Sequence, residues 1–281
     1  MSRNSTLSRI RAGIAAVAIA AFALTGCAPA DTAATDESAI TTITPGKLTI
    51  GTGLPAYEPW VVGDAPESGE GFEAAVAYAI AAELGFAAED VVWVRTTFDE
   101  AIAPGAKNFD FNLQQYTITE ERKANVDFSD PYYVTTQTVI TVAGSAAENA
   151  TSLAELKDLL VGAASATTSF TAIEEFITPT AGAQAFNSND DAKAALQSGQ
   201  LDALVVDLPT ALYLTCCDLT DGKILGQIAG AEGGDSFGLV LDKGSALTAA
   251  VNAAIKALRD SGKLAEIEKK WLTDTSAPVL K

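Results

Sequence analysis

The strongest constraint on the fold is an alternation of strand-like and helix-like segments that begins at Gly46. "GKLTIGTG" predicts a strand, and "GFEAAVAYAIAAELGF" repeats its apolar side chains at helical spacing. "VVWVRTTF" and "FDFNLQQY" predict two more strands, with a short helix from Phe98 to Ile102 between them. A β-α-β-α-β order predicts a mostly parallel sheet covered by helices.

The same alternation starts again after residue 136. "QTVITVAG", "LVGAAS" and "LDALVVD" predict strands, and "SLAELKDLL", "TAIEEFI" and "DDAKAALQSG" predict helices. Two α/β units in direct succession indicate two lobes. Near the end of the chain, "LTAAVNAAIKALRDSG" and "KLAEIEKKWL" predict helices whose apolar stripes belong to the core.

The first residues have the composition of an export signal. Three arginines precede the apolar segment "AGIAAVAIAAFAL", which is shorter than the roughly 20 residues that span a bilayer as a helix. The segment ends in "LTGC", which resembles the bacterial lipobox, where the cysteine is lipidated and the chain is cut before it. We therefore expect residues 1–26 to be a signal peptide and residues 27–45 a flexible tether from lipidated Cys27. The alternative is an ordinary signal peptide that ends near a cysteine.

The composition argues against several classes of function. A formal charge of −18 disfavours binding to nucleic acid and a polybasic grip on lipid, so any membrane contact would run through the lipid anchor. The chain has no histidine, which removes the commonest metal ligand and the usual general base. We expect no cofactor, no metal and no catalytic residue.

Two of the three cysteines are adjacent, at Cys216 and Cys217. Adjacent cysteines cannot adopt ordinary disulfide geometry without distorting the peptide between them. A disulfide between neighbours is one alternative outside the cell, but we expect two partly buried thiols.

Arg122 stands in the first turn of a predicted helix whose N-cap is Thr119. A cation there is unfavourable for the helix dipole unless a bound carboxylate compensates it. Thr117 could add a hydroxyl group to such a site. The alternative is a surface arginine paired with Glu121 or Asp127, and the residues alone leave both interpretations open.

The second α/β unit offers two further polar positions. In "SATTSF", Thr167 and Thr168 could donate to an anion across a cleft, or could simply cap the following helix. Asp207 ends an apolar strand just before Pro209, at the sheet edge where ligands bind in open α/β sheets. It could hold an ammonium group or cap the next helix.

Several stretches, taken in order, resemble the extracellular solute-binding proteins of family 3, the polar amino-acid receptors of ABC importers. They are "IGTG…YEPW", "GFEAAVAYAIAAELGF", "FDFNLQQYTITEERKANVDFSDPYY", "VGAASATTSF", "LDALVVDLPTALYL" and "FGLVLDKGSALTAAVNAAI…LRDSGKLAEIEKKWL". The resemblance implies an α/β, two-lobed, periplasmic-binding-protein-like fold of type II, with two crossing strands between the lobes. It places residues 46–137 and 235–281 in lobe 1 and residues 138–234 in lobe 2.

The resemblance also implies a role for each candidate site residue. Arg122 and Thr117 would bind the α-carboxylate of an amino acid, with help from Thr168 or Thr167 in the other lobe. Asp207 would bind the α-ammonium group, and Tyr57 and Trp60 would pack against the ligand side chain.

The chain departs from the family pattern at the positions expected to select the side chain. Gly53 stands where the family often has an aspartate, and Glu73 and Ala75 in "GFEAAV" replace two aspartates. Gln115 can both donate and accept, so it could read a polar side chain. These changes favour neutral polar or acidic amino acids over lysine and arginine.

The function implied is that of a monomeric, extracytoplasmic lipoprotein that closes on a polar amino acid and delivers it to a membrane permease. Two alternatives remain. One is an enzyme similar to the cyclohexadienyl dehydratases, with Glu58 or Glu73 as the acid/base carboxylate. The other is an amino-acid sensor for a signalling partner.

Overall fold

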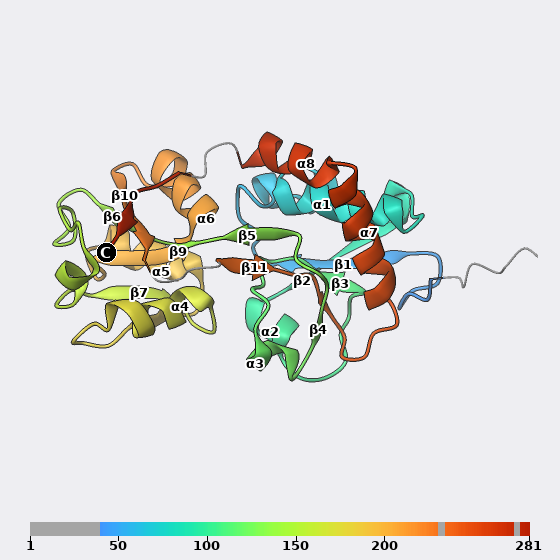
Figure 1. The fold of residues 1–281 in the computed structure, drawn as a ribbon, viewed down its shortest axis with the longest axis horizontal. Coiled ribbons are helices and arrows are strands. Elements are labelled where there is room, and N and C mark those ends of the chain that lie inside the picture. Colours follow the sequence, from blue (N-terminus) through green and yellow to red (C-terminus); the bar gives the residue numbers. More distant parts are fainter. Residues whose placement is uncertain (1–39, 230–233, 273–275) are drawn as a thin grey trace, which may run out of the picture. The chain divides into compact units, whose positions relative to one another are not determined.

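The computed structural model describes residues 40–229, 234–272 and 276–281, and Ile40–Lys281 form one compact unit built from two lobes (Figure 1). The expected signal peptide and Cys27 lie outside the described residues. Within the described part, no helix combines the length and apolarity needed to cross a membrane. The two-lobed α/β fold expected from the sequence is confirmed.

The first lobe is built on a five-stranded sheet of order β2-β1-β3-β12-β4. Its strands are β1 (Leu48–Gly53), β2 (Val91–Thr96), β3 (Phe111–Asn112), β4 (Asp127–Phe128) and β12 (Val240–Leu241). β1 runs parallel to β2 and β3, as the sequence predicts, whereas β12 is antiparallel to β3 and β4. The sheet is therefore mixed, because a strand from late in the chain inserts between two early ones.

Three long helices pack together in the first lobe, and Figure 1 shows them over the same side of it. They are α1 (Phe72–Glu83), α7 (Thr248–Asp260) and α8 (Lys263–Trp271). α1 ends next to Gly85, whose φ of +86° suits glycine. The apolar faces of these helices form one core with Ile50 and Phe111 of the sheet. The short helices are α2 (Phe98–Ile102), which has a capping box made by Thr97 and Glu100, and α3 (Glu120–Lys123).

The second lobe is built on a six-stranded sheet of order β13-β10-β6-β9-β7-β8. Its strands are β6 (Gln137–Val142), β7 (Val161–Ala164), β8 (Gln184–Phe186), β9 (Ala203–Asp207), β10 (Gly222–Ile228) and β13 (Val279–Leu280). Its α-helices are α4 (Thr168–Ala172), α5 (Asn189–Gln197) and α6 (Leu208–Tyr213). Two separate apolar clusters pack in this lobe, and both include residues of β6 and β9.

Two short antiparallel strands, β5 (Tyr133–Thr135) and β11 (Asp235–Phe237), lie between the lobes (Figure 1). Asp235 pairs with Thr135 and Phe237 with Tyr133. β5 continues within two residues into β6, so this ribbon joins the sheet of one lobe to that of the other.

The structure differs from the sequence-based expectation at the end of the chain. We expected residues 235–281 in the first lobe, but β13 pairs with β10 in the sheet of the second. This pairing supplies hydrogen-bond partners for an edge strand that would otherwise be open. The segment "SLAELKDLL" forms only a 3₁₀ turn, Leu153–Leu156, and the predicted helix "TAIEEFI" continues α4 as a π-helical turn, Ile173–Ile177.

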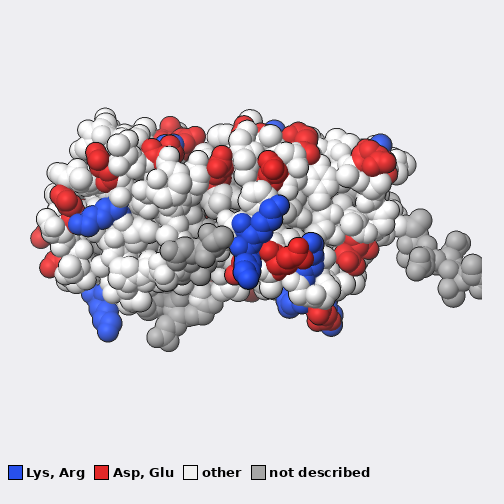
Figure 2. All heavy atoms as spheres, turned by 90° about the horizontal axis from the view of Figure 1, so that it is seen from above, with Lys and Arg blue, Asp and Glu red and all other residues white. Residues whose placement is uncertain are grey.

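Cys216 and Cys217 form a disulfide, so the expectation of two partly buried thiols was wrong. Both residues are exposed, in a π-helical turn (Leu214–Asp218) that continues α6. On the face shown in Figure 2, acidic and basic side chains are scattered among uncharged ones, and neither sign forms a continuous field.

Candidate functional site

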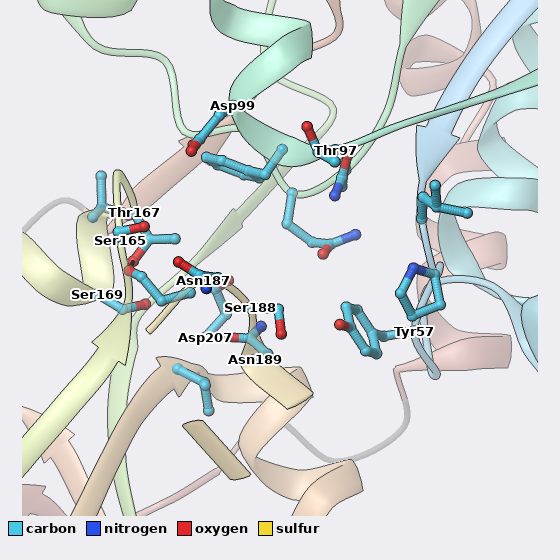
Figure 3. A pocket seen from close by; sticks show the side chains of 18 of the residues that line it. Tyr57, Thr97, Asp99, Ser165, Thr167, Ser169, Asn187, Ser188, Asn189 and Asp207 are labelled. Atoms are coloured by element: carbon cyan, nitrogen blue, oxygen red, sulfur yellow. Dashed lines mark hydrogen bonds between the residues drawn. The ribbon is translucent and has the colours of Figure 1, made fainter. Parts of the chain in front are cut away.

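A cavity of about 230 Å³ is lined by residues of both lobes. It brings together six of the eight residues that the sequence suggested for ligand binding: Tyr57, Gln115, Arg122, Thr167, Thr168 and Asp207. Thr117 lies immediately behind its wall, and Trp60 is buried in the core of the first lobe. Figure 3 shows Tyr57 on one side of the cavity and Ser165, Thr167 and Ser169 on the other.

The guanidinium group of Arg122 is buried between the lobes, with 7% of the residue exposed. Nη1 donates to the carbonyl oxygen of Thr117 in its own lobe, and Nη2 donates to that of Ala166 in the second lobe, each at 2.7 Å. The group also lies 5.2 Å from the ring centroid of Phe98. These contacts fix its plane and leave other N–H groups free to meet an anion.

The interpretation of Arg122 as a surface ion-pair residue does not hold. Thr119 caps α3 as expected, since its hydroxyl accepts a bond from the backbone N–H of Arg122. Neither Glu121 nor Asp127 forms an ion pair with the arginine among the described residues, and Asp127 pairs with Lys243 instead. Arg122 is thus a buried cation that lines a cavity, and burial lowers its pKa.

The threonines meet across the gap between the lobes. The hydroxyl of Thr117 lies 3.1 Å from that of Thr168, which lines the cavity from the second lobe. Thr167 is the N-cap of α4, where its side chain accepts a bond from the N–H of Phe170 and donates one to the carbonyl of Ala164. Thr167 is therefore a helix cap as well as part of the cavity wall.

Asp207 lines the cavity at the carboxyl end of β9, and its side chain makes no capping bond to α6. Its Oδ1 accepts a 3.0 Å bond from the amide of Gln137. Burial, assisted by the nearby carboxylate of Asp235, raises the pKa of Asp207 to about 8, although Gln137 and Arg122 act in the opposite direction. An ammonium group that reached this carboxylate would find an acceptor with few competing donors.

Tyr57 and Trp60 have different positions, although we expected both to pack against a ligand. Tyr57 lines the cavity, and burial together with the carboxylate of Asp190 in the second lobe raises its pKa to about 12. Trp60 is fully buried, makes edge-on contacts with Phe72 and Phe237, and does not line the cavity. The indole ring is large and mostly apolar. Burying it in the core beside β1 and α1 therefore stabilises the protein more than placing it in a polar cleft would.

Gln115 lines the cavity, but its side chain is held from behind. Its backbone N–H and its amide both donate to the carboxylate of Glu73, and the hydroxyl of Tyr132 donates to the same group. Gln115 has a φ of +52°, a strained value for a non-glycine residue, which these bonds help to hold. Glu73 is 1% exposed, and burial raises its pKa to about 7.

Several residues of the cavity wall were not predicted from the sequence: Leu54, Pro55, Thr97, Phe98, Asp99, Gln114, Ser165, Ser169, Asn187, Ser188 and Asn189. Gln114 is the most informative of them. Its Oε1 accepts a bond from the hydroxyl of Tyr116, and its NH₂ group has no partner among the described residues. A Cβ atom on Gly53 would lie 3.0 Å from Gln114 Nε2 and 2.7 Å from the Pro55 carbonyl oxygen, so the glycine makes room for the amide. In the sequence, the glycine at position 53 was the feature that could have indicated the position of Gln114.

Neither carboxylate proposed for an enzymatic reaction lines this cavity. Glu73 lies behind Gln115, and Glu58 lines a separate cavity of about 30 Å³ beside Tyr213. Within the described ranges, no group of three or more acidic or cysteine side chains could hold a metal ion.

The chain is similar to known proteins over most of its length. Residues 48–274 match the family described as bacterial extracellular solute-binding proteins, family 3. The chain is 33% identical over 218 residues to the ABC transporter glutamine-binding protein GlnH of Bacillus subtilis, covering 75% of this chain and 77% of the relative. It is 30% identical over 234 residues to an L-arginine-binding protein of Pseudomonas aeruginosa, covering 78% and 85%.

The fold is similar to that of solved binding proteins. An ancestral arginine-binding protein bound to glutamine superimposes with a TM-score of 0.69 at 31% identity, covering 82% of this chain and 100% of the other. These relatives are solute-binding proteins and not enzymes, which supports a non-enzymatic role.

Proposed function

Because the chain belongs to the bacterial extracellular solute-binding proteins of family 3, we propose that it binds a polar amino acid between its lobes and delivers it to the permease of an ABC importer. One observation carries the proposal. A buried cation from the first lobe, Arg122, and an acid from the second, Asp207, line the same cavity.

The two groups have the charges that an amino-acid zwitterion requires. Burying both ends of a zwitterion is costly unless each is paired, and a carboxylate binds a guanidinium group through two parallel hydrogen bonds. Arg122 would take the α-carboxylate beside Thr168, and Asp207 would take the α-ammonium group. Since these residues come from different lobes, the ligand would hold the lobes closed.

The rest of the wall disfavours an acidic side chain on the ligand. Arg122 is the only basic residue that lines the cavity within the described ranges, so a side-chain carboxylate would have no second cation to pair with. The free NH₂ group of Gln114 is a donor suited to a side-chain carbonyl oxygen. Two acids of the wall, Asp99 and Asp207, lie on opposite sides of the cavity in Figure 3. Asp207 is assigned to the α-ammonium group, so it does not select the side chain of the ligand. An amide such as that of L-glutamine fits this set of groups.

The test uses isothermal titration calorimetry with L-glutamine, L-glutamate and L-arginine. The wild-type protein should bind L-glutamine most tightly of the three. Gln114→Glu replaces the amide by a carboxylate of the same shape. It should lower the affinity for L-glutamine by about tenfold or more and raise the affinity for L-arginine. Gln200→Glu, at an exposed position, adds the same charge and should change neither. Binding of none of the three, or an unchanged preference in Gln114→Glu, would contradict this choice of ligand.

The attachment to the membrane is a separate proposal that rests on the lipobox-like "LTGC". Residues 1–26 would be removed, Cys27 would carry the lipid, and residues 27–45 would tether a monomeric receptor to the outer face of the membrane beside its permease. Detergent phase partitioning tests this. The wild-type protein should enter the detergent phase and Cys27→Ser should stay in the aqueous phase, whereas equal partitioning would contradict the anchor.

A further inference from the structure

A buried amide joins two carboxylates behind the cavity. Gln137, 2% exposed at the start of β6, donates through Nε2 to Asp207 Oδ1 at 3.0 Å and to Asp235 Oδ2 at 2.6 Å. The hydroxyl of Ser169 donates to Oε1 of the same glutamine at 2.6 Å. Because ionised carboxylate oxygens only accept hydrogen bonds, the NH₂ end of Gln137 faces the two acids and its Oε1 faces the hydroxyl of Ser169.

Asp235 connects this cluster to both lobes. Its Oδ2 also accepts a 2.6 Å bond from the hydroxyl of Thr168, which in turn lies 3.1 Å from that of Thr117 in the first lobe. Asp235 is the first residue of β11 and pairs with Thr135 of β5. The cluster therefore touches the ribbon between the lobes and the wall of the cavity at once.

The charges of the cluster do not balance. Two carboxylates face one cation, Arg122, whose side-chain hydrogen bonds within the described part of the chain go to carbonyl oxygens and not to either acid. The other titratable groups that act on Asp207 add no positive charge: they are Glu73, Tyr132 and Tyr133 of the first lobe. Two carboxylates that share one donor repel each other, and a proton on one of them relieves this.

The geometry indicates which acid would hold the proton. Asp235 Oδ2 already accepts two short hydrogen bonds, whereas Asp207 accepts one longer bond and so keeps an oxygen free to carry a proton. The raised pKa of Asp207, about 8, agrees with this assignment.

We propose that Asp207 is protonated at neutral pH when no ammonium group occupies the cavity, and that the arriving ammonium group displaces this proton. Asp235 and Gln137 act as positioning residues for the exchange. The O–H bond of the acid breaks, the proton leaves to solvent, and an ammonium N–H donates to the carboxylate that remains. This inference rests on the proposed amino-acid site, and it makes ligand capture release about one proton near pH 7.

The first test needs no ligand. Carbon-13 NMR of purified, ligand-free protein labelled at aspartate carboxyl carbons gives the titration midpoint of Asp207, which is assigned from the signal lost in Asp207→Asn. The expected midpoint lies near 8 and falls in Asp235→Asn, because the repelling charge is removed. Asp158→Asn, at an exposed site in the same lobe, should leave it unchanged. A midpoint near the ordinary value of about 4 would overturn the proposal.

The second test measures the proton directly. Titration of L-glutamine into the protein at pH 7, in two buffers of different ionisation enthalpy, gives the number of protons released. We expect about one in the wild-type protein and clearly fewer in Asp235→Asn. Binding with no proton released would overturn the exchange. If L-glutamine does not bind at all, the choice of ligand in the proposed function has failed, while the NMR midpoint still decides whether Asp207 holds a proton.

Discussion

The indole Nε1 of Trp60 donates a 3.0 Å hydrogen bond to the hydroxyl of Thr210, and this buried contact joins the core of the first lobe to helix α6 of the second. We expected Trp60 to pack against a ligand. Its position instead ties the segment after β1 to the helix that begins beside Asp207.

Removing this hydrogen bond should weaken ligand binding. In Thr210→Val the shape of the side chain is kept, but closing the lobes would bury the indole N–H without a partner, which costs about 1–3 kcal/mol. The dissociation constant should rise by about 5- to 150-fold in calorimetry. Thr180→Val removes an exposed hydrogen bond to Asp158 inside the second lobe and should have little effect. Equal affinities in both variants would show that the contact does not support closure.

Arg122→Lys should abolish useful binding although it keeps the charge. Lysine cannot bind a carboxylate through two parallel bonds or reach the carbonyl oxygens of Thr117 and Ala166 with the same geometry. We expect a loss of about 2–5 kcal/mol in binding free energy. Arg259→Lys changes an exposed arginine and serves as the control. Near-normal affinity in folded Arg122→Lys protein would rule out this residue as the carboxylate site.

The buried carboxyl group of Glu73 should make stability depend on pH. Burial raises its pKa to about 7, so the folded state holds the proton more tightly than the unfolded chain does. The free energy of unfolding therefore falls as pH rises from about 4.5 to above 7, by on the order of 3 kcal/mol. Glu73→Gln should remove this part of the pH dependence, and exposed Glu83→Gln on the same helix should not. Denaturant titrations between pH 5 and pH 8 measure it, and parallel profiles for wild type and Glu73→Gln would contradict the account.

The disulfide between Cys216 and Cys217 should be detected by mass spectrometry. The peptide that carries both cysteines should take up alkylating reagent only after reduction. A disulfide between adjacent residues closes a loop of almost no length, so it removes little entropy from the unfolded chain. Its loss should therefore change the melting temperature by no more than about 2 °C. Neither cysteine lines the cavity, and the Cys216→Ser, Cys217→Ser double variant should keep its ligand affinity. Alkylation without reduction would show free thiols.

The repeated alternation of strands and helices allowed the architecture to be predicted, because the periodicity of buried side chains sets the type of element. Strands of two or three residues, such as β4, β8 and β13, were missed since so short a segment carries no period. β13 also depends on an edge of β10 that only the folded second lobe provides.

Two of the three charged residues that line the cavity in the described ranges, Arg122 and Asp207, could be predicted, whereas Asp99 and the shape of the cavity could not. Arg122 and Asp207 stand at a helix start and a strand end, positions that a sequence reveals. Asn187 and Ser188 reach the same cavity from a loop after β8, a strand that the sequence analysis did not predict. Trp60 was misplaced because its sequence neighbourhood does not tell which side of a segment faces the core.

A thermal-shift screen of purified, ligand-free protein against the twenty amino acids at about 1 mM tests the central claim most directly. A ligand at 100 times its dissociation constant adds about 2.7 kcal/mol of stability, which is a shift of several degrees. We predict a large shift with L-glutamine or another neutral polar amino acid, and small shifts with lysine, arginine and glutamate. No shift with any of the twenty would contradict an amino-acid site between Arg122 and Asp207.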